Sequence, residues 1–251
     1  MTDPTALPTV PGYDVVEQID VGGFSRVYRA IQRRFERPVA IKVLNAGFAD
    51  ERQRRAFERE CRVMGQLSSH PNIVTVYDSA TAQVGGHELP AIVMELYTGT
   101  YRNAGRLSIP EVVDVGVKIA DALDHIHRRE IVHRDLKPHN LFISEHGEPA
   151  IADFGISTIG GEHTTGARFT LKYAPPELLR EGVADASGDI YSLGATLFQL
   201  ATGHVPFDGT DDADVVRRVM VAPPPPLERS DAPPGLERII HRCLAKYPSE
   251  R

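Results

Sequence analysis

The stretch His133-Arg134-Asp135-Leu136-Lys137-Pro138-His139-Asn140 is the part of this 251-residue chain that says most about its fold. It is a polar island, because short apolar runs around residues 131–132 and 141–143 lie on either side of it. Taken alone, the island predicts a charged loop between two strands. The segments before and after the island decide whether it is only a loop or part of a functional site.

The segments before the island predict a small, strand-rich region that ends near residue 96. A Gly22-Gly23 turn separates the first two expected strands, and residues 1–12, with three prolines and no periodicity, look like a flexible leader. The five expected strands are Tyr13–Ile19, Arg26–Ile31, Pro38–Leu44, Ile73–Tyr77 and Ala91–Leu96.

Residues 51–67 predict a helix with one buried face, because Phe57, Cys61, Met64 and Leu67 recur at helical spacing. Arginines occupy its other face. We interpret them as a solvated surface. A nucleic-acid patch is the alternative, and the glutamates interspersed among the arginines argue against it.

Helices dominate after residue 97. The pattern predicts helices at Pro110–His127, at Asp189–Ala201, which is nearly all apolar and therefore expected to be buried, and at Gly235–Lys246. Pro223–Pro226 is expected to be a semi-rigid connector rather than a recognition peptide. The stripe expected to be buried on the first of these helices consists of Val113, Val117, Ala120, Leu123 and Ile126.

Composition narrows the class of protein. The formal net charge is −6 and the pI is about 5.9, which argues against a general nucleic-acid binder. The two cysteines, Cys61 and Cys243, provide no disulfide framework and favour a reducing compartment. No apolar run reaches the roughly 18 residues that span a bilayer, and the N-terminus lacks the pattern of a signal peptide. We therefore expect a cytoplasmic globular protein with no membrane segment in this chain.

Further islands accompany the first one along the chain. They are IDVGGFSRVY at 19–28, VAIK at 39–42, DFG at 153–155, YAPPE at 173–177 and DIYSLG at 189–194. In this order and spacing, the islands resemble the motifs of the bacterial (actinobacterial-type) Hanks-type serine/threonine protein kinase catalytic domain. The resemblance covers Tyr13–Arg251.

The resemblance implies an α+β, bilobal protein-kinase-like fold. A small antiparallel-sheet N-lobe would span about 13–96 and a larger helical C-lobe about 97–251. It also implies an enzyme that transfers the γ-phosphoryl group of ATP to Ser/Thr hydroxyls of proteins, itself included, with Mg²⁺ or Mn²⁺ as cofactor. ATP and protein substrates would be its partners, nucleic acid would not, and a second copy forming a dimer is left open.

Lys42, the last residue of the VAIK island, is predicted to form an ion pair. A lysine inside an apolar strand is costly to bury alone, so it predicts a nearby carboxylate. Glu60, 18 residues later on the predicted helix, is the best candidate, and the family places its ion-pair glutamate there.

The island His133–Asn140 corresponds to the family pattern H-R-D-L-K-x-x-N. By resemblance, Asp135 is the catalytic base, Lys137 contacts the γ-phosphate, and Asn140 and Asp153 bind the metal ion. Thr170 falls where the family keeps a threonine that contacts the catalytic Asp and Lys.

The nucleotide-binding residues are also implied by resemblance. Only the middle glycine of G-x-G-x-x-G is kept, as Gly22, because Asp20 and Ser25 replace the other two. The adenine would lie against Val27 and Ala40, and Met94 would be a gatekeeper before the hinge. The expected set is Ile19, Asp20, Val21, Gly22, Gly23, Phe24, Ser25, Val27, Ala40, Lys42, Met94, Glu95, Tyr97 and Phe142.

Other matched residues are expected to stabilise the fold. Arg251 falls on the family arginine that pairs with the glutamate of A-P-E, here Glu177, and Tyr191 replaces the family tryptophan. His125 and His127 cannot face each other at i and i+2 of a helix, so we interpret them as surface or capping residues rather than a metal site.

Two departures from the family pattern matter for function. Only 12 residues separate Tyr97 from Pro110, so the helix that follows the hinge in relatives should be shortened or missing. Asp20 would repel phosphate, which motivates a rival hypothesis of a pseudokinase or nucleotide-binding scaffold with weak or no transfer activity. A small-molecule phosphotransferase is disfavoured by the A-P-E segment.

Regulation is expected between Asp153 and Glu177. Thr164 and Thr165 lie in a glycine-containing stretch, and the hypothesis is that autophosphorylation there orders the loop. Arg134 would be the first partner of that phosphate, with Arg168 or Lys172 as helpers.

Overall fold

The computed structural model describes residues 7–23, 25–48, 50–152 and 171–251, and for Ala56 and Glu60 only the backbone. The chain divides into two compact units, and the described residues up to Tyr97 form the first and those from Thr98 onward the second.

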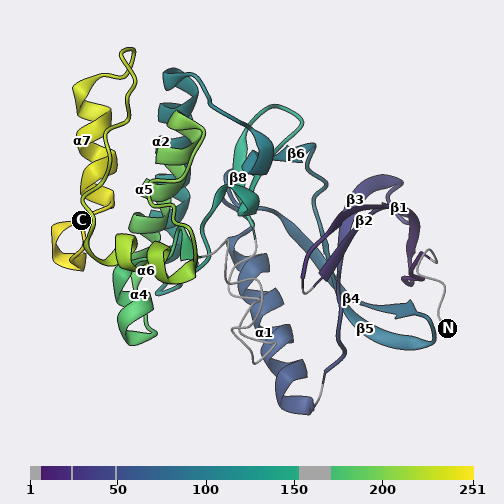
Figure 1. Cartoon of the computed structure of the whole chain (residues 1–251). Coiled ribbons are helices and arrows are strands. Elements are labelled where there is room, and N and C mark those ends of the chain that lie inside the picture. The colour runs from purple at the N-terminus through teal and green to yellow at the C-terminus, as the bar shows by residue number, and fades with distance from the viewer. Residues whose placement is uncertain (1–6, 24, 49, 153–170) are drawn as a thin grey trace. The chain divides into compact units, whose positions relative to one another are not determined.

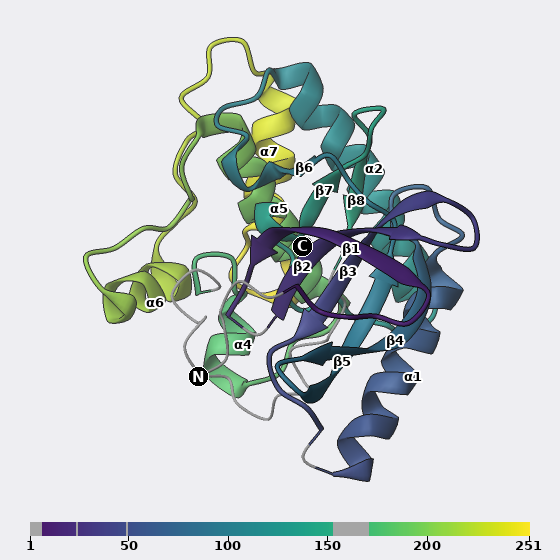
Figure 2. The same cartoon turned by 90° about the vertical axis from the view of Figure 1, so that its right-hand side faces the viewer.

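The first unit is a five-stranded antiparallel sheet with one helix. The strands are β1 (Tyr13–Val21), β2 (Ser25–Gln32), β3 (Arg37–Leu44), β4 (Val76–Val84) and β5 (His87–Met94). Their order across the sheet is β1-β2-β3-β5-β4. Helix α1 (Glu51–Leu67) packs beside β4 (Figures 1 and 2).

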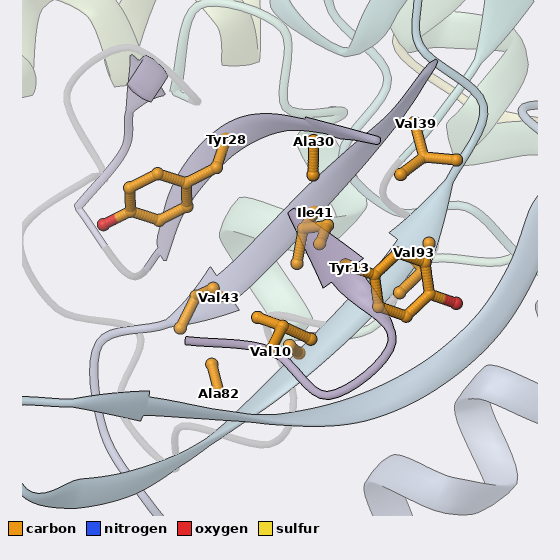
Figure 3. Close-up of a cluster of buried hydrophobic side chains, with 10 residues drawn as sticks. Val10, Tyr13, Tyr28, Ala30, Val39, Ile41, Val43, Ala82 and Val93 are labelled. Carbon is orange, nitrogen blue, oxygen red and sulfur yellow. The ribbon is translucent and has the colours of Figure 1, made fainter. Parts of the chain in front are cut away.

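One buried hydrophobic cluster of this unit lies on one face of the sheet, because strand side chains alternate between faces. On β3, Val39, Ile41 and Val43 are at most 3% exposed. They pack with side chains from the neighbouring strands, as Figure 3 shows. Ala40 and Lys42, which alternate with them, therefore belong to the opposite face.

The expected leader is wrong from Thr9 onward. Thr9 and Gln83 exchange backbone hydrogen bonds of 3.0 and 2.8 Å, which adds the segment to the edge of β4. Val10 is 1% exposed and belongs to the core in Figure 3. The local sequence, with its prolines, does not predict this pairing, because the pairing depends on a strand more than 70 residues away.

The expected strands hold on β1 to β3 and fail in part beyond them. β4 begins at Val76 and continues to Val84, so most of the expected strand Ile73–Tyr77 is wrong. Ile73 and Val74 are buried outside any named strand, and buried apolar residues give the same signal in a loop. β5 begins four residues before the expected start of its strand and ends two before the expected end.

Helices make up most of the second unit. They are α2 (Ile109–His127), α4 (Pro176–Glu181), α5 (Ala186–Thr202), α6 (Asp212–Val221) and α7 (Pro234–Cys243), with the 3₁₀ turns η1 (Tyr101–Asn103), η2 (Pro138–Asn140) and η4 (Pro248–Glu250). A small sheet has the order β6 (Gly99–Thr100), β7 (Leu141–Ile143) and β8 (Pro149–Ile151). The mostly buried α5 packs against α2 and α7 (Figure 1). The α+β class, with an antiparallel first region and a more helical second one, is confirmed.

The buried stripe of α2 was predicted one residue out of phase over its first turns. Val113 and Val117 are 41% and 65% exposed, and Ala120 is exposed as well. The buried residues are Ile109, Val112, Val115, Ile119, Ala122, Leu123 and Ile126. Both valine sets fit helical spacing, and only the packing against α5 distinguishes them.

The segment after Tyr97 contains no α-helix, which confirms the shortened connection. It forms β6 and the single turn η1, and β6 pairs with β7 through Gly99–Ile143 and Thr100–Phe142. Thr98 adds hydrogen bonds from its hydroxyl to two carbonyls at the end of β7, at 3.0 and 3.1 Å. Among the helices of the described ranges, none combines the length and the apolar character that crossing a bilayer requires.

Candidate active site

The polar island of the second unit is held in place by one buried carboxylate. Asp189, on α5, is 1% exposed. Its two oxygens accept the backbone N–H groups of His133 and Arg134 at 2.8 and 2.9 Å. His127 Nε2, at the end of α2, lies 2.7 Å from the same carboxylate. Our interpretation of His127 as a surface or capping residue is therefore wrong.

Arg134 adopts a backbone conformation that the carboxylate supports. Its φ is 68°, a left-handed value that is uncommon for any residue except glycine. Two consecutive N–H groups can converge on one anion when the chain turns in this way. The strain at Arg134 is therefore offset by two charge-assisted hydrogen bonds to Asp189.

His133 links the island to strand β8. The side chain is fully buried, and its Nδ1 accepts the Asp135 N–H at 3.2 Å. Because Nδ1 is an acceptor, Nε2 carries the proton and donates to the Ala152 carbonyl at 2.9 Å. Ala152 N–H in turn donates to the Asn140 carbonyl at 3.0 Å. Position 152, immediately before Asp153, is thus tied to the island at two points.

The three polar side chains that the motif singles out meet within hydrogen-bond distance. Lys137 Nζ lies 2.9 and 2.8 Å from the two carboxylate oxygens of Asp135. Asn140 Nδ2 donates to the Asp135 carbonyl at 2.7 Å and to Oδ2 at 3.0 Å. The Asp135 side chain stays 26% exposed, so it is fixed in direction and still open to a reactant.

The donor set of Asn140 fits a divalent cation. Its side-chain hydrogen bonds to Asp135 use the amide nitrogen, and Asn140 is 3% exposed. The remaining group is the amide oxygen, a hard ligand of the kind that Mg²⁺ and Mn²⁺ take. The described residues contain no group of three or more His, Cys, Asp or Glu that could hold a metal ion alone. A cation bound to Asn140 would also take other oxygen ligands, such as those of a phosphate.

Four predicted nucleotide-binding residues of the first unit share one face of its sheet. Val27 is opposite Lys42 between β2 and β3, and Ala40 is opposite Met94 between β3 and β5. Directly opposed residues of an antiparallel pair lie on the same face. This is the face away from the core cluster in Figure 3, and it carries Lys42 beside apolar residues and the exposed Arg29, which pairs with Glu17.

The glycine-containing turn joins β1 to β2. Gly22 N–H donates to the Ser25 carbonyl at 2.8 Å, and a Cβ added at Gly23 would meet nothing within 4 Å. Asp20 is exposed, and its Oδ1 accepts the neighbouring Val21 N–H at 2.9 Å. Ile19 and Val21 are 45% and 58% exposed, which leaves apolar surface at the base of the turn.

The predicted hinge residues lie at the end of the first unit. Glu95 N–H donates to the Thr75 carbonyl at 2.9 Å, which fixes the backbone directly after Met94. The Tyr97 hydroxyl donates to Glu95 Oε2 at 3.2 Å, and burial, followed by the nearby Glu95 charge, raises the pKa of Tyr97. Phe142, the last predicted nucleotide residue, is half-buried on β7 of the second unit.

Several predicted residues lie outside the described ones. They are Phe24, Asp153, Thr164, Thr165 and Thr170, together with the side chain of Glu60. Lys42 is described and half-buried. Its predicted pairing with Glu60 stays a prediction.

A bidentate ion pair stabilises the far side of the second unit. Arg251 donates to the two carboxylate oxygens of Glu177 at 2.6 and 2.8 Å, as the motif predicted. The arginine side chain is 1% exposed, and its guanidinium lies 5.0 Å from the ring centre of Tyr191. Ser192, beside Tyr191, donates to the Tyr173 carbonyl at 2.9 Å. These contacts tie the A-P-E segment to α5.

The fold and the ordered polar island together define a phosphotransferase-like domain of two units, and comparison with known families identifies it. Residues 13–251 match the family described as the protein kinase domain. The chain therefore belongs to the protein kinase family, whose members use ATP and a divalent metal ion.

Curated relatives of this chain are bacterial. PknK of Mycobacterium tuberculosis, named a serine/threonine-protein kinase, is 37% identical over 98% of this chain and 23% of its own length. PrkC of Bacillus subtilis is 36% identical over 95% of this chain and 38% of its length. PknB of Mycolicibacterium smegmatis is 35% identical over 95% and 40%. The chain thus spans less than half the length of these curated relatives.

Proposed function

We propose that this chain transfers the γ-phosphoryl group of ATP to serine and threonine hydroxyls of proteins, including its own. The observation that carries the proposal is the cluster of Asp135, Lys137 and Asn140, held by the buried Asp189 in a loop of fixed shape. Relatives named serine/threonine-protein kinases over 95% or more of the chain support the choice of acceptor.

Asp135 would receive the proton of the attacking hydroxyl. Its carboxylate is oriented by Lys137 and Asn140, so a substrate hydroxyl hydrogen-bonded to it would be aligned for attack. General-base assistance of this kind contributes about 10²–10⁴-fold to a rate. The Lys137 ammonium, within 3 Å of the same carboxylate, would neutralise charge on the transferring group.

Lys42 and Asn140 would hold the cofactors, with Asp153 as a second metal ligand. When bound, ATP supplies the phosphoryl group and Mg²⁺ or Mn²⁺ neutralises its charge. Lys42 would orient the phosphates from the non-core face of the first unit's sheet. Val27, Ala40 and Met94 on that face would contact the adenine.

The pseudokinase alternative is not favoured. Asp20 is its main support, and in the structure this carboxylate accepts a hydrogen bond from its own strand. Lys42, Asp135, Asn140 and Asp153 are all present in the sequence. We expect Asp20 to weaken ATP affinity rather than to abolish transfer.

The proposal extends to regulation and location. Phosphorylation of Thr164 or Thr165 would create a partner for Arg134. Lys172, which was expected to help bind this phosphate, already forms a 2.6 Å ion pair with Asp208. Arg134 is therefore the better partner for the phosphate. We place the domain in the cytoplasm, as an ATP-dependent enzyme with protein rather than nucleic-acid substrates. A dimer stays a proposal.

Autophosphorylation with radiolabelled ATP and either Mg²⁺ or Mn²⁺ tests the central proposal. Asp135→Asn should reduce incorporation by about 10²–10⁴-fold while ATP binding, measured separately, persists. Asp124→Asn, the same change at a carboxylate that is 53% exposed, is the matched control and should behave as wild type. Wild-type protein that binds ATP and incorporates no phosphate would support the pseudokinase instead.

A further inference from the structure

The outer face of α1 carries a straight row of four arginines. They are Arg52, Arg55, Arg59 and Arg62, and all four are exposed. At 100° per residue, the row lies roughly opposite the buried side chains of the helix. Those buried side chains are Phe57, Cys61, Met64 and Leu67. With a rise of 1.5 Å per residue, the row extends about 15 Å along the helix. We call it the arginine row.

Little of the charge of this row is neutralised within the described side chains. Arg55 pairs with Glu51 at 3.3 Å, and these two side chains are 73% and 64% exposed. The other three arginines make no ion pair with a described carboxylate. In a chain with a net charge of −6, the row is a concentrated basic feature.

Helix stability does not explain where these arginines lie. Arg52 and Arg55 are close to the N-terminus of α1, where the helix dipole disfavours positive charge. The last turn, where the dipole favours cations, contains none. Neighbours in the row are three or four residues apart, and like charges at that spacing repel. Among the described side chains, the Glu51–Arg55 pair offsets only part of this repulsion. An interaction outside the helix would account better for the row.

We propose that the arginine row is a docking surface for an acidic helix of a partner protein. A helix with carboxylates at the same spacing of three, four and three residues presents a matching row with the same rise. Packed alongside α1, it could pair with every arginine at once. Glu51 and Glu58, which are exposed beside the row, would repel the continuous phosphates of a nucleic acid. The proposal does not depend on the kinase activity.

Two synthetic helical peptides of the same composition test this surface. One has four glutamates at the spacing of the row, and the other has the same four distributed around the helix. Fluorescence anisotropy with the whole chain at about 50 mM salt should give about tenfold tighter binding for the matched peptide, and about 200 mM salt should weaken both. Equal binding of the two peptides would overturn the proposal, because diffuse charge attraction would then explain it.

Arginine-to-glutamine variants test whether the matched peptide binds at the arginine row. Arg52→Gln/Arg55→Gln/Arg59→Gln/Arg62→Gln should reduce affinity for the matched peptide by at least about tenfold. A control with Arg34, Arg180, Arg238 and Arg242 changed to Gln has the same change in net charge at exposed positions and should retain binding. Unchanged binding by the row variant would contradict the inference.

Hydrogen exchange on the wild-type chain gives a readout that needs no variant. The matched peptide should slow exchange of α1 amides, and no change there would count against docking on this helix. A single-stranded oligonucleotide of equal charge serves as the competitor. Tighter binding of the oligonucleotide than of the matched peptide would overturn the proposal in favour of a nucleic-acid surface.

Discussion

The polar island of the second unit, His133–Asn140, and the glycine-containing turn of the first unit differ in how many buried contacts hold them. In the loop, His133 is fully buried, Asn140 is 3% exposed, and Asp189 accepts two backbone N–H groups from beneath. The turn has exposed apolar side chains at its base, with Ile19 at 45% and Val21 at 58%, and one short backbone bond from Gly22.

This difference follows from what each segment is proposed to do. Asp135 must stand at a fixed position for a hydroxyl to be aligned, and a buried network provides that before any reactant arrives. A turn that covers phosphates must move to admit them, so it can have few buried contacts of its own.

Removing the carboxylate beneath the loop should have the largest effect. Asp189→Ala leaves the buried His133 N–H, the partly buried Arg134 N–H and His127 without their acceptor, which should lower the unfolding free energy by about 3–5 kcal/mol. Asp189→Asn keeps the shape but turns an amide NH₂ toward one of those N–H groups, so its main effect should be on kcat.

Chemical denaturation and steady-state kinetics measure these two effects. Glu17→Gln, at an exposed pair with Arg29 of 3.5 Å in the first unit, is the control and should change stability by no more than about 0.5 kcal/mol. Similar losses for Asp189→Ala and Glu17→Gln would show that burial of the network contributes nothing.

The partly buried Lys246 of the second unit should make the unfolding free energy depend on pH. Burial, followed by the charge of Arg251, lowers the pKa of Lys246 to about 8. Between about pH 8 and its ordinary value of 10.5, the unfolded chain holds a proton that the folded chain has released. The unfolding free energy should therefore rise with pH over this range.

Comparison with Lys246→Met isolates that contribution from the tyrosines, which titrate in the same range. The stability of wild type relative to this variant should increase from pH 8 to 10. Lys118 pairs with Asp114 and Glu148, which raise its pKa, so Lys118→Met should show no such gain. A flat difference for Lys246→Met would mean that the pKa of Lys246 is the same in the folded and unfolded chains, which would refute the lowered value.

The smallest effect is expected on the turn. A carboxylate about 4 Å from a phosphate costs on the order of 1 kcal/mol in well-solvated surroundings, so Asp20→Asn should tighten ATP binding about fivefold. Asparagine retains the oxygen that accepts the Val21 N–H, so the change tests charge alone. Calorimetric titration with ATP measures it, and an unchanged Kd would refute the repulsion.

Much of this arrangement could be predicted from local sequence. The helix at 51–67 has matching bounds in the structure because its apolar spacing allows one buried face, and the pairing of Arg251 with Glu177 followed from motif positions. The residues that make up the polar island of Asp135, Lys137 and Asn140 were also identified before their contacts were known.

The errors share a physical cause, which is contact between distant segments. Val112 and Val113 are equally apolar, and only the neighbouring α5 decides which is buried. Val10 is buried because Thr9 pairs with Gln83. The bond from His127 to Asp189 joins residues 62 positions apart, and a histidine near a helix end has no local signal for it.

Amide hydrogen exchange, measured with and without a non-hydrolysable ATP analogue, tests the comparison most directly. The His133 and Arg134 amides should exchange slowly in the free protein and change little on binding, because Asp189 already accepts their hydrogen bonds. The amides around Gly22 and Gly23 should exchange fast when free and slow down with nucleotide. Fast exchange at His133 and Arg134 that slows only with nucleotide would contradict a polar island that is ordered before nucleotide binds.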